Sequence, residues 1–392
     1  MLRIEGDFKV VKEKIVKGEE NLKDILRGCT LLGTGGGGPF REGVDYISED
    51  IKEDRELKLI DPKDVDDETW TCSVYYAGTI THLIEIPEEK KKLPAKTVNK
   101  ELIIATKELE KILGAPIKAL VPLELGGGNT AAAMHAAMGL GIPLVDGDYA
   151  GRAIPELEMI TPCLKGKPDV PIVTCNEFGE IVIIKESVNY TRTEVITRWL
   201  SVASFGKIGN AGYPMKGKDM KEVIVPNTVS KCLEIGKAIR EAKEQGKDVV
   251  KVVLDITKGW LLFKGKVTKK TWESKGGFTY GETILEGIDE FKGHEFKIWF
   301  KNENHITWKN GEPFVTSPDL ISTLDLNKKE PVTNTDIAEG DVLAVIGIKA
   351  PDILRTKEAL EVLAPKHFGF DLEYVPIAVS YTHLTLPTTE RV

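Results

Sequence analysis

The chain has 392 residues, of which 41% are hydrophobic and 29% charged, and its formal net charge is −8. This length is enough for two or three domains with substantial cores, and the balance is typical of a soluble globular protein. The negative charge argues against a nucleic-acid partner, and no apolar run reaches the roughly 20 residues that span a bilayer.

The first 168 residues alternate helix-like and strand-like segments. Helices are predicted over residues 20–28, 99–113 and 130–140, and strands over residues 57–60, 73–77, 119–123 and 143–145. The order strand, loop, helix, strand over residues 119–145 predicts a parallel crossover unit. We therefore expect an α/β N-terminal domain, residues 1–168, with a parallel or mixed sheet.

Residues 169–378 have a different pattern, dominated by short β-type runs. One strong helix is predicted over residues 228–245, with Asn227 as its cap. We therefore expect a β-rich α+β C-terminal domain. The predicted β-type runs are residues 181–184, 251–254, 260–263, 264–267, 283–285 and 296–300.

The last fourteen residues, 379–392, read like the translation of a sequencing adapter. They are rich in threonine and follow no helical or strand periodicity. We expect this tail not to be native and leave it out of the fold prediction.

The cysteines and the N-terminus indicate the compartment. An odd number of cysteines without a CxxC pair favours free thiols over disulfides or a zinc site. Residues 1–7 do not resemble a signal peptide, so a cytoplasmic location is expected. The cysteines are Cys29, Cys72, Cys163, Cys175 and Cys232.

Two dense glycine clusters are the most informative feature of the chain. Glycine leaves backbone amides open to a ligand, and four glycines in succession cost conformational entropy that an ordinary connection need not incur. The alternatives are flexible connections and, for Asn129, a helix cap. The residues expected to bind substrate are Thr34, Gly35, Gly36, Gly37 and Gly38, and Glu124, Gly126, Gly127, Gly128 and Asn129.

Four polar residues follow the predicted strand at residues 143–145, at the edge where the second glycine cluster should lie. They are Asp146, Asp148, Arg152 and Glu156. Two carboxylates and a guanidinium can orient a polar heterocycle or activate water, and close like charges raise the pKa of one carboxyl. The alternative is a helix cap with an Asp–Arg ion pair.

Other polar residues give weaker signals. His135 should pack inside its helix, whereas His82 lies in a loop-like stretch and could be a ligand or base. Residues 302–304 either reach over the first domain's site or form a hairpin. Nothing near Cys163 indicates an activated thiol. The first glycine cluster lacks the Lys-Ser/Thr pair of a phosphate loop, so no organic cofactor is expected.

Several separated motifs resemble the DUF917 family of S-methyl thiohydantoin desulfurase-like, hydantoinase-related proteins. They are Leu32–Gly38, Leu123–Asn129, Asp146–Leu157, Gly276–Thr279, Asn302–Asn304, Ser317–Leu320 and His367–Pro376. The family has Asp-Ala-Asp where this chain has Asp146-Gly147-Asp148, so both carboxylates are kept. The resemblance implies an α/β domain, a β-rich domain, and a five-membered cyclic imide or S-alkylated thiohydantoin as substrate.

These observations predict a hydrolase of hydantoin-like rings that releases methanethiol from an S-methyl thiohydantoin. Asp146 or Asp148 would be the general base, and the other carboxylate or Glu156 would position water or protonate a leaving atom. Arg152 would neutralise developing charge, and the glycine amides would supply preorganised donors.

Two alternatives stay open at this point. One is a metal-dependent cyclic amidase, with Asp146, Asp148, Glu124 and a histidine around one divalent ion. The other is a non-catalytic subunit that serves a hydantoinase/oxoprolinase partner. A homo-oligomer that acts on a small cyclic substrate, without nucleic-acid or membrane partners, is expected.

Overall fold

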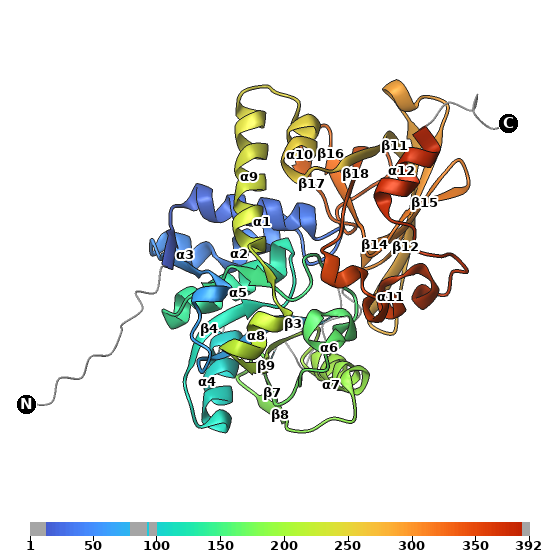
Figure 1. Cartoon of the computed structure of the whole chain (residues 1–392). Coiled ribbons are helices and arrows are strands. Elements are labelled where there is room, and N and C mark those ends of the chain that lie inside the picture. Colours follow the sequence, from blue (N-terminus) through green and yellow to red (C-terminus); the bar gives the residue numbers. More distant parts are fainter. Residues whose placement is uncertain (1–12, 79–91, 94–99, 386–392) are drawn as a thin grey trace, which may run out of the picture.

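Two eight-stranded sheets organise the chain in this computed structural model (Figure 1). The structure describes residues 13–78, 92–93 and 100–385, so His82 and the end of the tail lie outside the described residues. The first sheet, with its helices, forms the left and lower part of the view, and the second forms the upper right.

The first sheet has a parallel centre and antiparallel flanks. Strands β2, β5, β4 and β3 run parallel, while β1, β9, β7 and β8 extend the sheet antiparallel at its two sides. The predicted mixed α/β sheet is confirmed. Its order is β1 (Glu13–Val16), β2 (Leu57–Ile60), β5 (Leu144–Val145), β4 (Ile117–Pro122), β3 (Trp70–Gly78), β9 (Lys207–Lys216), β7 (Ile172–Cys175) and β8 (Ile181–Ile184).

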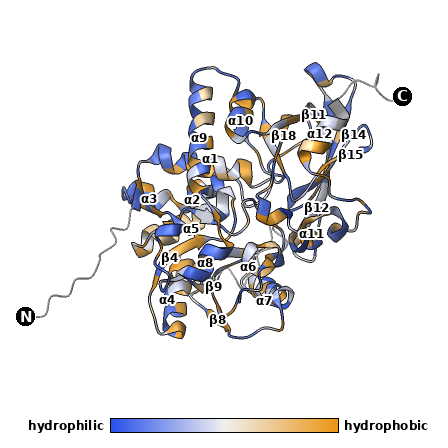
Figure 2. Cartoon of the chain, viewed as in Figure 1, coloured by the Kyte–Doolittle hydropathy of each residue, from blue (hydrophilic) through white to orange (hydrophobic). Residues whose placement is uncertain are grey.

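Helices cover this sheet and bury its apolar strands. The alanine-rich α5 is buried on nearly all sides and packs on β3 and β4. The hydrophobic colouring of β4 is clear in Figure 2. A helix that is apolar all round belongs in a core. The helices of this part are α1 (Glu19–Leu32), α2 (Phe40–Tyr46), α3 (Ser48–Lys52), α4 (Glu101–Leu113), α5 (Gly127–Leu140), α6 (Thr161–Leu164), α7 (Tyr190–Ala203) and α8 (Gly217–Val223).

The first sheet continues beyond the predicted boundary at residues 168/169. Strands β7, β8 and β9 follow that boundary in sequence, yet β9 pairs directly with β3. The pairing is long-range, and nothing local in the sequence indicates it. The division into units 1–168 and 169–378 stays a prediction.

Residues 251–254 form a helix, so the predicted strand there is wrong. They lie in α10 (Val249–Thr257), where the Asp248 side chain accepts a hydrogen bond from the Lys251 amide, at 3.2 Å. The buried residues 249, 250, 253 and 257 recur at helical spacing. An N-cap and packing against α9 (Thr228–Glu244) outweigh the strand preference of four valines.

The second sheet is antiparallel throughout and confirms the predicted β-rich C-terminal part. Its core contains stacked aromatic rings, among them Phe263 and Phe296 at 4.9 Å between centroids. The strand order is β15 (Glu312–Thr316), β14 (Glu303–Lys309), β13 (Glu295–Lys301), β12 (Phe278–Gly287), β11 (Trp260–Lys275), β18 (Val342–Ile348), β16 (Leu320–Asp325) and β17 (Glu330–Pro331).

Smaller elements complete the fold. Strand β6 (Gly147–Asp148) pairs with β10 (Val225–Pro226), which brings residue 148 beside the start of α9. Helix α11 (Lys357–Leu363) and α12 (Ile377–Thr385) follow the second sheet. Helix α12 continues past residue 379, where the tail expected to be non-native begins. The structure does not test the origin of that tail, which stays a prediction. Short 3₁₀ turns lie at Pro62–Asp64, Leu157–Met159, Asp289–Phe291, Asp352–Arg355 and Pro365–Phe368.

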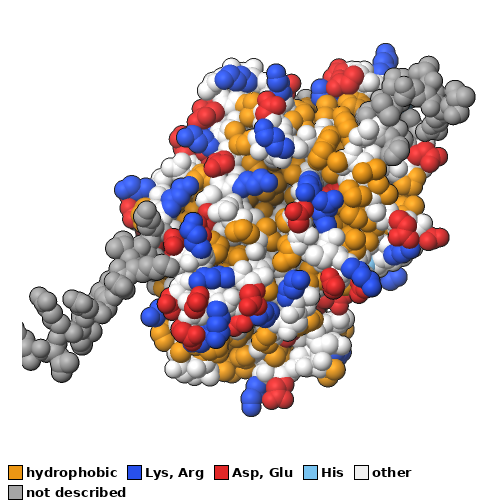
Figure 3. Space-filling model, in the orientation of Figure 1, with side chains coloured by type: hydrophobic (Ala, Val, Ile, Leu, Met, Phe, Trp, Pro, Cys, Tyr) orange, Lys and Arg blue, Asp and Glu red, His pale blue; other side chains and the backbone are white. Residues whose placement is uncertain are grey.

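The surface carries charges of both signs. Lysine, arginine and acidic side chains are intermixed over the face shown in Figure 3. Of the helices in the described part of the chain, none combines the length and apolarity needed to cross a bilayer.

Helices α1 and α9 approach so closely that glycine is needed on both. A Cβ atom at Gly236 would lie 1.8 Å from the Asp24 carbonyl oxygen, and one at Gly28 would lie 2.0 Å from the Cys232 carbonyl oxygen. The contact holds α9, and therefore its N-terminus beside β6, against the first sheet's helices.

We expect Gly236→Ala to lower the free energy of unfolding by about 1–3 kcal/mol. The new methyl would collide with the α1 backbone, and this cost should exceed the roughly 1 kcal/mol that Ala gains over Gly in a helix. Urea unfolding measures the change. The exposed Lys237→Ala in the same helix is the control, and equal stability of Gly236→Ala and wild type would contradict the prediction.

Candidate functional site

The two glycine clusters meet backbone to backbone. We call residues 33–39 glycine loop 1, residues 124–129 glycine loop 2, and their contact the glycine junction. The Gly37 carbonyl oxygen accepts hydrogen bonds from the amides of Gly128 and Asn129, each at 3.1 Å. A Cβ atom at Gly126 would lie 2.2 Å from that oxygen, so no side chain fits there.

The second domain covers glycine loop 1 from the opposite side. The Asn304 amide donates to the Thr34 carbonyl and the Asn334 amide to the Gly35 carbonyl, both at 2.8 Å. The Glu303 carboxylate lies over Gly36, where an added Cβ would be 1.9 Å from Oε1. Residues 302–304 therefore do both things that the sequence left open: they form the β13–β14 hairpin and reach the glycine loop.

Many of the amides expected to bind substrate are used within the protein. The Gly36 amide donates to the Gly33 carbonyl at 2.9 Å, and the Gly126 amide donates to the Thr130 hydroxyl at 3.1 Å. The Gly128 amide is taken up by the glycine junction itself. The glycines therefore allow the backbones of the two glycine loops to approach each other closely. Substrate binding by their amides stays a prediction.

Arg152 is fully buried and joins the two domains. Its guanidinium donates to the carbonyls of Ala153 at 2.9 Å, Pro318 at 3.0 Å and Asn304 at 3.1 Å, and to the Thr34 hydroxyl at 3.0 Å. Burial lowers the pKa of Arg152 to about 10, and the nearby Glu303, Asp319 and Glu124 oppose that shift. Four of its five N–H donors are thus occupied by protein oxygens.

Glu124 is held in place by two donors from its own domain. The Ile154 amide donates to Oε2 at 2.7 Å, and the Asn129 side chain donates to Oε1. Burial raises the pKa of Glu124 to about 7, with a further contribution from the Asp148 charge, while Arg152 opposes the shift. At neutral pH this carboxyl can both hold and release a proton.

Glu303 is the second buried carboxyl of the cluster. Its Oε2 atom is buried and makes no hydrogen bond within the described part of the chain. Burial raises the pKa of Glu303 well above its usual range, the Glu124 charge adds to this, and Arg152 opposes it. Burial therefore favours the protonated form of Glu303.

Asp148 is the third buried carboxyl, and its charge acts on Glu124. Its Oδ2 atom accepts hydrogen bonds from the amides of Ala150 at 2.9 Å and Gly151 at 2.7 Å. Burial raises the pKa of Asp148 to about 7, although the Thr228 hydroxyl and the two amides oppose the shift.

Asp146 and Glu156 lie in different surroundings from Asp148. The Asp146 carboxylate holds the start of α9, accepting the Ser230 amide at 2.8 Å and the Ser230 hydroxyl. Glu156 pairs with Lys301 and with His367, whose Nε2 is 3.1 Å away. Burial alone would raise the pKa of Glu156, but the hydrogen bonds from His367 and Lys301 outweigh it and lower the pKa to about 2.

His305 belongs to the same buried region, and the sequence assigned it no role of its own. Its ring nitrogens have no hydrogen-bond partner among the described residues, and its ring lies 4.1 Å from that of Phe368, between centroids. Burial and the Arg152 charge lower the pKa of His305 well below its ordinary value. A neutral imidazole therefore adjoins the cluster.

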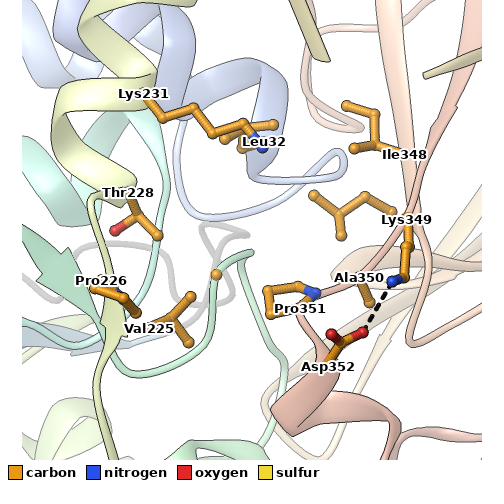
Figure 4. A pocket seen from close by; sticks show the side chains of 12 residues that line it. Leu32, Val225, Pro226, Thr228, Lys231, Ile348, Lys349, Ala350, Pro351 and Asp352 are labelled. Carbon is orange, nitrogen blue, oxygen red and sulfur yellow. Dashed lines mark ion pairs between the residues drawn. The ribbon is translucent and has the colours of Figure 1, made fainter. Parts of the chain in front are cut away.

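An open cavity of about 260 Å³ lies between the domains (Figure 4). Gly151 and Thr228, which contact Asp148, form part of its wall, and Lys231 and Lys349 lie toward its rim. The carboxyl groups of Glu124, Asp148 and Glu303 are not among its lining groups. The full lining is Leu32, Gly151, Val225, Pro226, Thr228, Lys231, Leu320, Ile348, Lys349, Ala350, Pro351 and Asp352.

Family models cover nearly the whole described chain. The S-Me-THD-like N-terminal domain matches residues 20–186, and the S-Me-THD-like C-terminal domain matches residues 188–377. The chain belongs to the S-Me-THD-like family. This confirms the resemblance to S-methyl thiohydantoin desulfurase-like proteins, and the two models meet about twenty residues after the predicted boundary.

A solved structure shares the fold of this S-Me-THD-like chain. It is the X-ray crystal structure of a protein from Chromobacterium violaceum, with a TM-score of 0.76 and 23% sequence identity. The match covers 93% of this chain and 100% of the other. No curated protein matches the chain.

We expect Asp148→Asn to change how stability depends on pH. The raised pKa means that native Asp148 keeps its proton up to about pH 7, whereas the unfolded chain releases it near pH 4. This contribution to stability is complete below pH 4 and is lost as the pH rises through 7. Asn fits, because its oxygen can accept both amides.

Relative to wild type, Asp148→Asn should gain on the order of 3 kcal/mol between pH 4.5 and pH 8. Urea unfolding at both pH values measures the difference. Asp289→Asn is the control, because residue 289 is exposed and its φ of 50° suits asparagine. Parallel stability curves for wild type and Asp148→Asn would show that burial does not raise this pKa.

Proposed function

We propose that the chain is a hydrolase of hydantoin-like five-membered rings that removes methanethiol from an S-methyl thiohydantoin. The observation that carries the proposal is the pair of buried carboxyl groups, Glu124 and Glu303, beside the glycine junction. Two carboxyls with different raised pKa values are suited to general acid–base work near neutral pH. Family membership supports the class of ring.

The proposed reaction consumes one water molecule and needs no oxidant or reductant. Water adds to the ring carbon that bears sulfur, and the adjacent ring nitrogen takes up a proton. The carbon–sulfur bond of the tetrahedral intermediate then breaks. The remaining oxygen forms the carbonyl of a hydantoin, and the sulfur leaves with a proton as methanethiol.

Glu303 and Glu124 are assigned complementary roles in this reaction. Burial favours the protonated form of Glu303, and its Oε2 has no partner in the described chain, so it would give a proton to the ring nitrogen. Glu124 would take the proton from water, because its pKa of about 7 makes it a usable base. Asn129 and the Ile154 amide fix its orientation.

The residues first assigned to catalysis take supporting roles in this proposal. The charge of Asp148 raises the pKa of Glu124. Arg152 holds the two domains together, since four of its donors already bind protein oxygens. Asp146 anchors α9. The low pKa of Glu156 makes it a weak base, and at neutral pH it is ionised and has no proton to donate.

Glu303→Gln should lower the rate of methanethiol release from S-methyl thiohydantoin by on the order of a hundredfold or more. Gln keeps the shape of the neutral carboxyl but gives up no proton, so the fold should persist. Thiol release is followed from pH 5 to 9, and ring products by mass spectrometry. The wild-type rate should rise through about pH 7, as Glu124 loses its proton.

The control for this test is Glu312→Gln, at an exposed position of β15. A Glu303→Gln variant as active as wild type would refute the assigned role. A wild-type chain that releases thiol only when a second protein is added would instead favour the non-catalytic subunit.

A metal-dependent cyclic amidase is the second candidate, favoured by one cluster. Ligand atoms of Glu156, Glu158 and His367 all lie within 4.8 Å of one another. This set differs from the one expected from the sequence, which placed a metal at Asp146, Asp148, Glu124 and a histidine. The Lys301 ammonium already pairs with Glu156 and would compete with a cation.

Treatment with a chelator separates the two candidates. If the buried carboxyl pair performs the chemistry, metal-free protein should keep its full rate of thiol release. Loss of ring-opening activity on chelation, restored by Zn²⁺ and abolished by Glu158→Gln, would favour the amidase instead.

A further inference from the structure

Glu42 of α2 places one carboxylate oxygen at the glycine junction. An added Cβ atom would lie 3.0 Å from its Oε2 at Gly38 and 3.2 Å at Gly128, so the absence of side chains there leaves this oxygen its space. The Glu42 side chain is half-buried, as are Gly38 and Asn129. Solvent therefore reaches the junction along this side, whereas Glu124 and Glu303 are buried.

Tyr46 and Lys207 orient the Glu42 carboxylate. The Tyr46 hydroxyl donates to Glu42 Oε1 at 2.8 Å and accepts a hydrogen bond from Lys207 Nζ, also at 2.8 Å. The ring of Tyr46 stacks on that of Tyr76 at 5.3 Å between centroids, and the Lys207 ammonium lies over both rings. The Tyr46 proton is therefore directed at Glu42 Oε1, and Oε2 accepts no hydrogen bond from the residues that the structure describes.

The first turn of α5 does not use this carboxylate as a cap. Its Gly128 and Asn129 amides both donate to the Gly37 carbonyl. Among the described residues, none donates a hydrogen bond to Glu42 Oε2. The one hydrogen bond that they give this carboxylate comes from Tyr46 and goes to Oε1. An oriented acceptor next to bare backbone, partly open to solvent, is an arrangement that suits a flat ligand with an N–H group.

We propose that Glu42 binds the ring N–H of a cyclic amide or ureide at the glycine junction. Such a ring presents an N–H donor in its own plane, which a carboxylate oxygen beside the side-chain-free backbone of Gly38 and Gly128 can accept. The carboxylate would favour rings with a free N–H over N-alkylated ones, because a methyl group there would leave the acceptor unpaired. The choice of ring class rests on the proposed function.

Calorimetric titration with hydantoin itself tests the proposal, with 1-methylhydantoin and 3-methylhydantoin as matched ligands. Wild type should bind hydantoin about 10–100-fold more tightly than the analogue whose methyl group blocks the contact, as expected for a hydrogen bond to a charged group. Glu42→Gln should lose most of this preference, because Tyr46 will hold the amide oxygen and leave the NH₂ group facing the ring N–H.

Two further variants identify the cause of any loss of preference for hydantoin over its N-methyl analogue. Asp45→Asn, exposed on the same helix, should bind all three ligands as wild type does. Tyr46→Phe keeps the carboxylate but removes its orienting donor, and it should weaken the preference for hydantoin less than Glu42→Gln does. Hydantoin binding that is absent in wild type, or unchanged in Glu42→Gln, would overturn the inference.

The readout separates this inference from the proposed function. Glu42-dependent hydantoin binding without methanethiol release would keep the inference and refute the hydrolase. Methanethiol release together with hydantoin binding that does not depend on Glu42 would support the hydrolase and refute the inference.

Discussion

A single buried guanidinium, that of Arg152, fixes the geometry on which the site depends. Moving such a charge out of water is costly, and the cost is tolerable only if protein groups replace the lost hydration. Here the replacement comes from both sides of the domain interface: Thr34 lies in the glycine loop, and the carbonyls of Asn304 and Pro318 belong to the second domain. Glycine loop 1 is therefore held between the two domains by these hydrogen bonds.

The same cation explains why several acids can be buried together. Glu124, Glu303 and Asp319 all lie close enough to stabilise the charge of Arg152, and Asp148 adjoins Glu124. Burial is the largest cause of the raised pKa values of Glu124, Asp148 and Glu303. At Glu124 and Glu303 the charge of a neighbouring carboxylate adds to the shift, and Arg152 opposes it. An arrangement that lowers stability at neutral pH is more readily understood as a functional device than as a structural one.

The parts of the fold that local patterns determine were predictable. Strand 57–60 and the unit from β4 through α5 to β5 have clean apolar periodicity and clear ends, and they appear as expected. Helix α10 was misassigned because Val249, Val250 and Val253 favour strands locally, whereas packing decides the outcome. The pairing of β9 with β3 joins segments more than a hundred residues apart, and a single sequence carries no local sign of it.

The site was predictable to the same extent and for the same reason. Glycine loop 2, Glu124 and Asp148 could be selected because they follow recognisable strands, whereas glycine loop 1 follows helix α1 and was selected for its four successive glycines. The partners that decide the use of Asp146 and Glu156 lie far away in sequence, at Ser230 and at Lys301 with His367. The local sequence pattern therefore assigned the three carboxyls of Asp146, Asp148 and Glu156 to one catalytic group.

The carboxyl groups differ in the partners that already bind their oxygens. An acid whose oxygens are all engaged, as at Asp146, anchors structure, and one paired with two cations, as at Glu156, is a poor proton carrier. Glu303 and Asp148 differ from these two, because each has one buried oxygen without a partner in the described chain. A buried polar atom left unsatisfied costs about 1–3 kcal/mol, a cost that a purely structural carboxyl has no reason to retain.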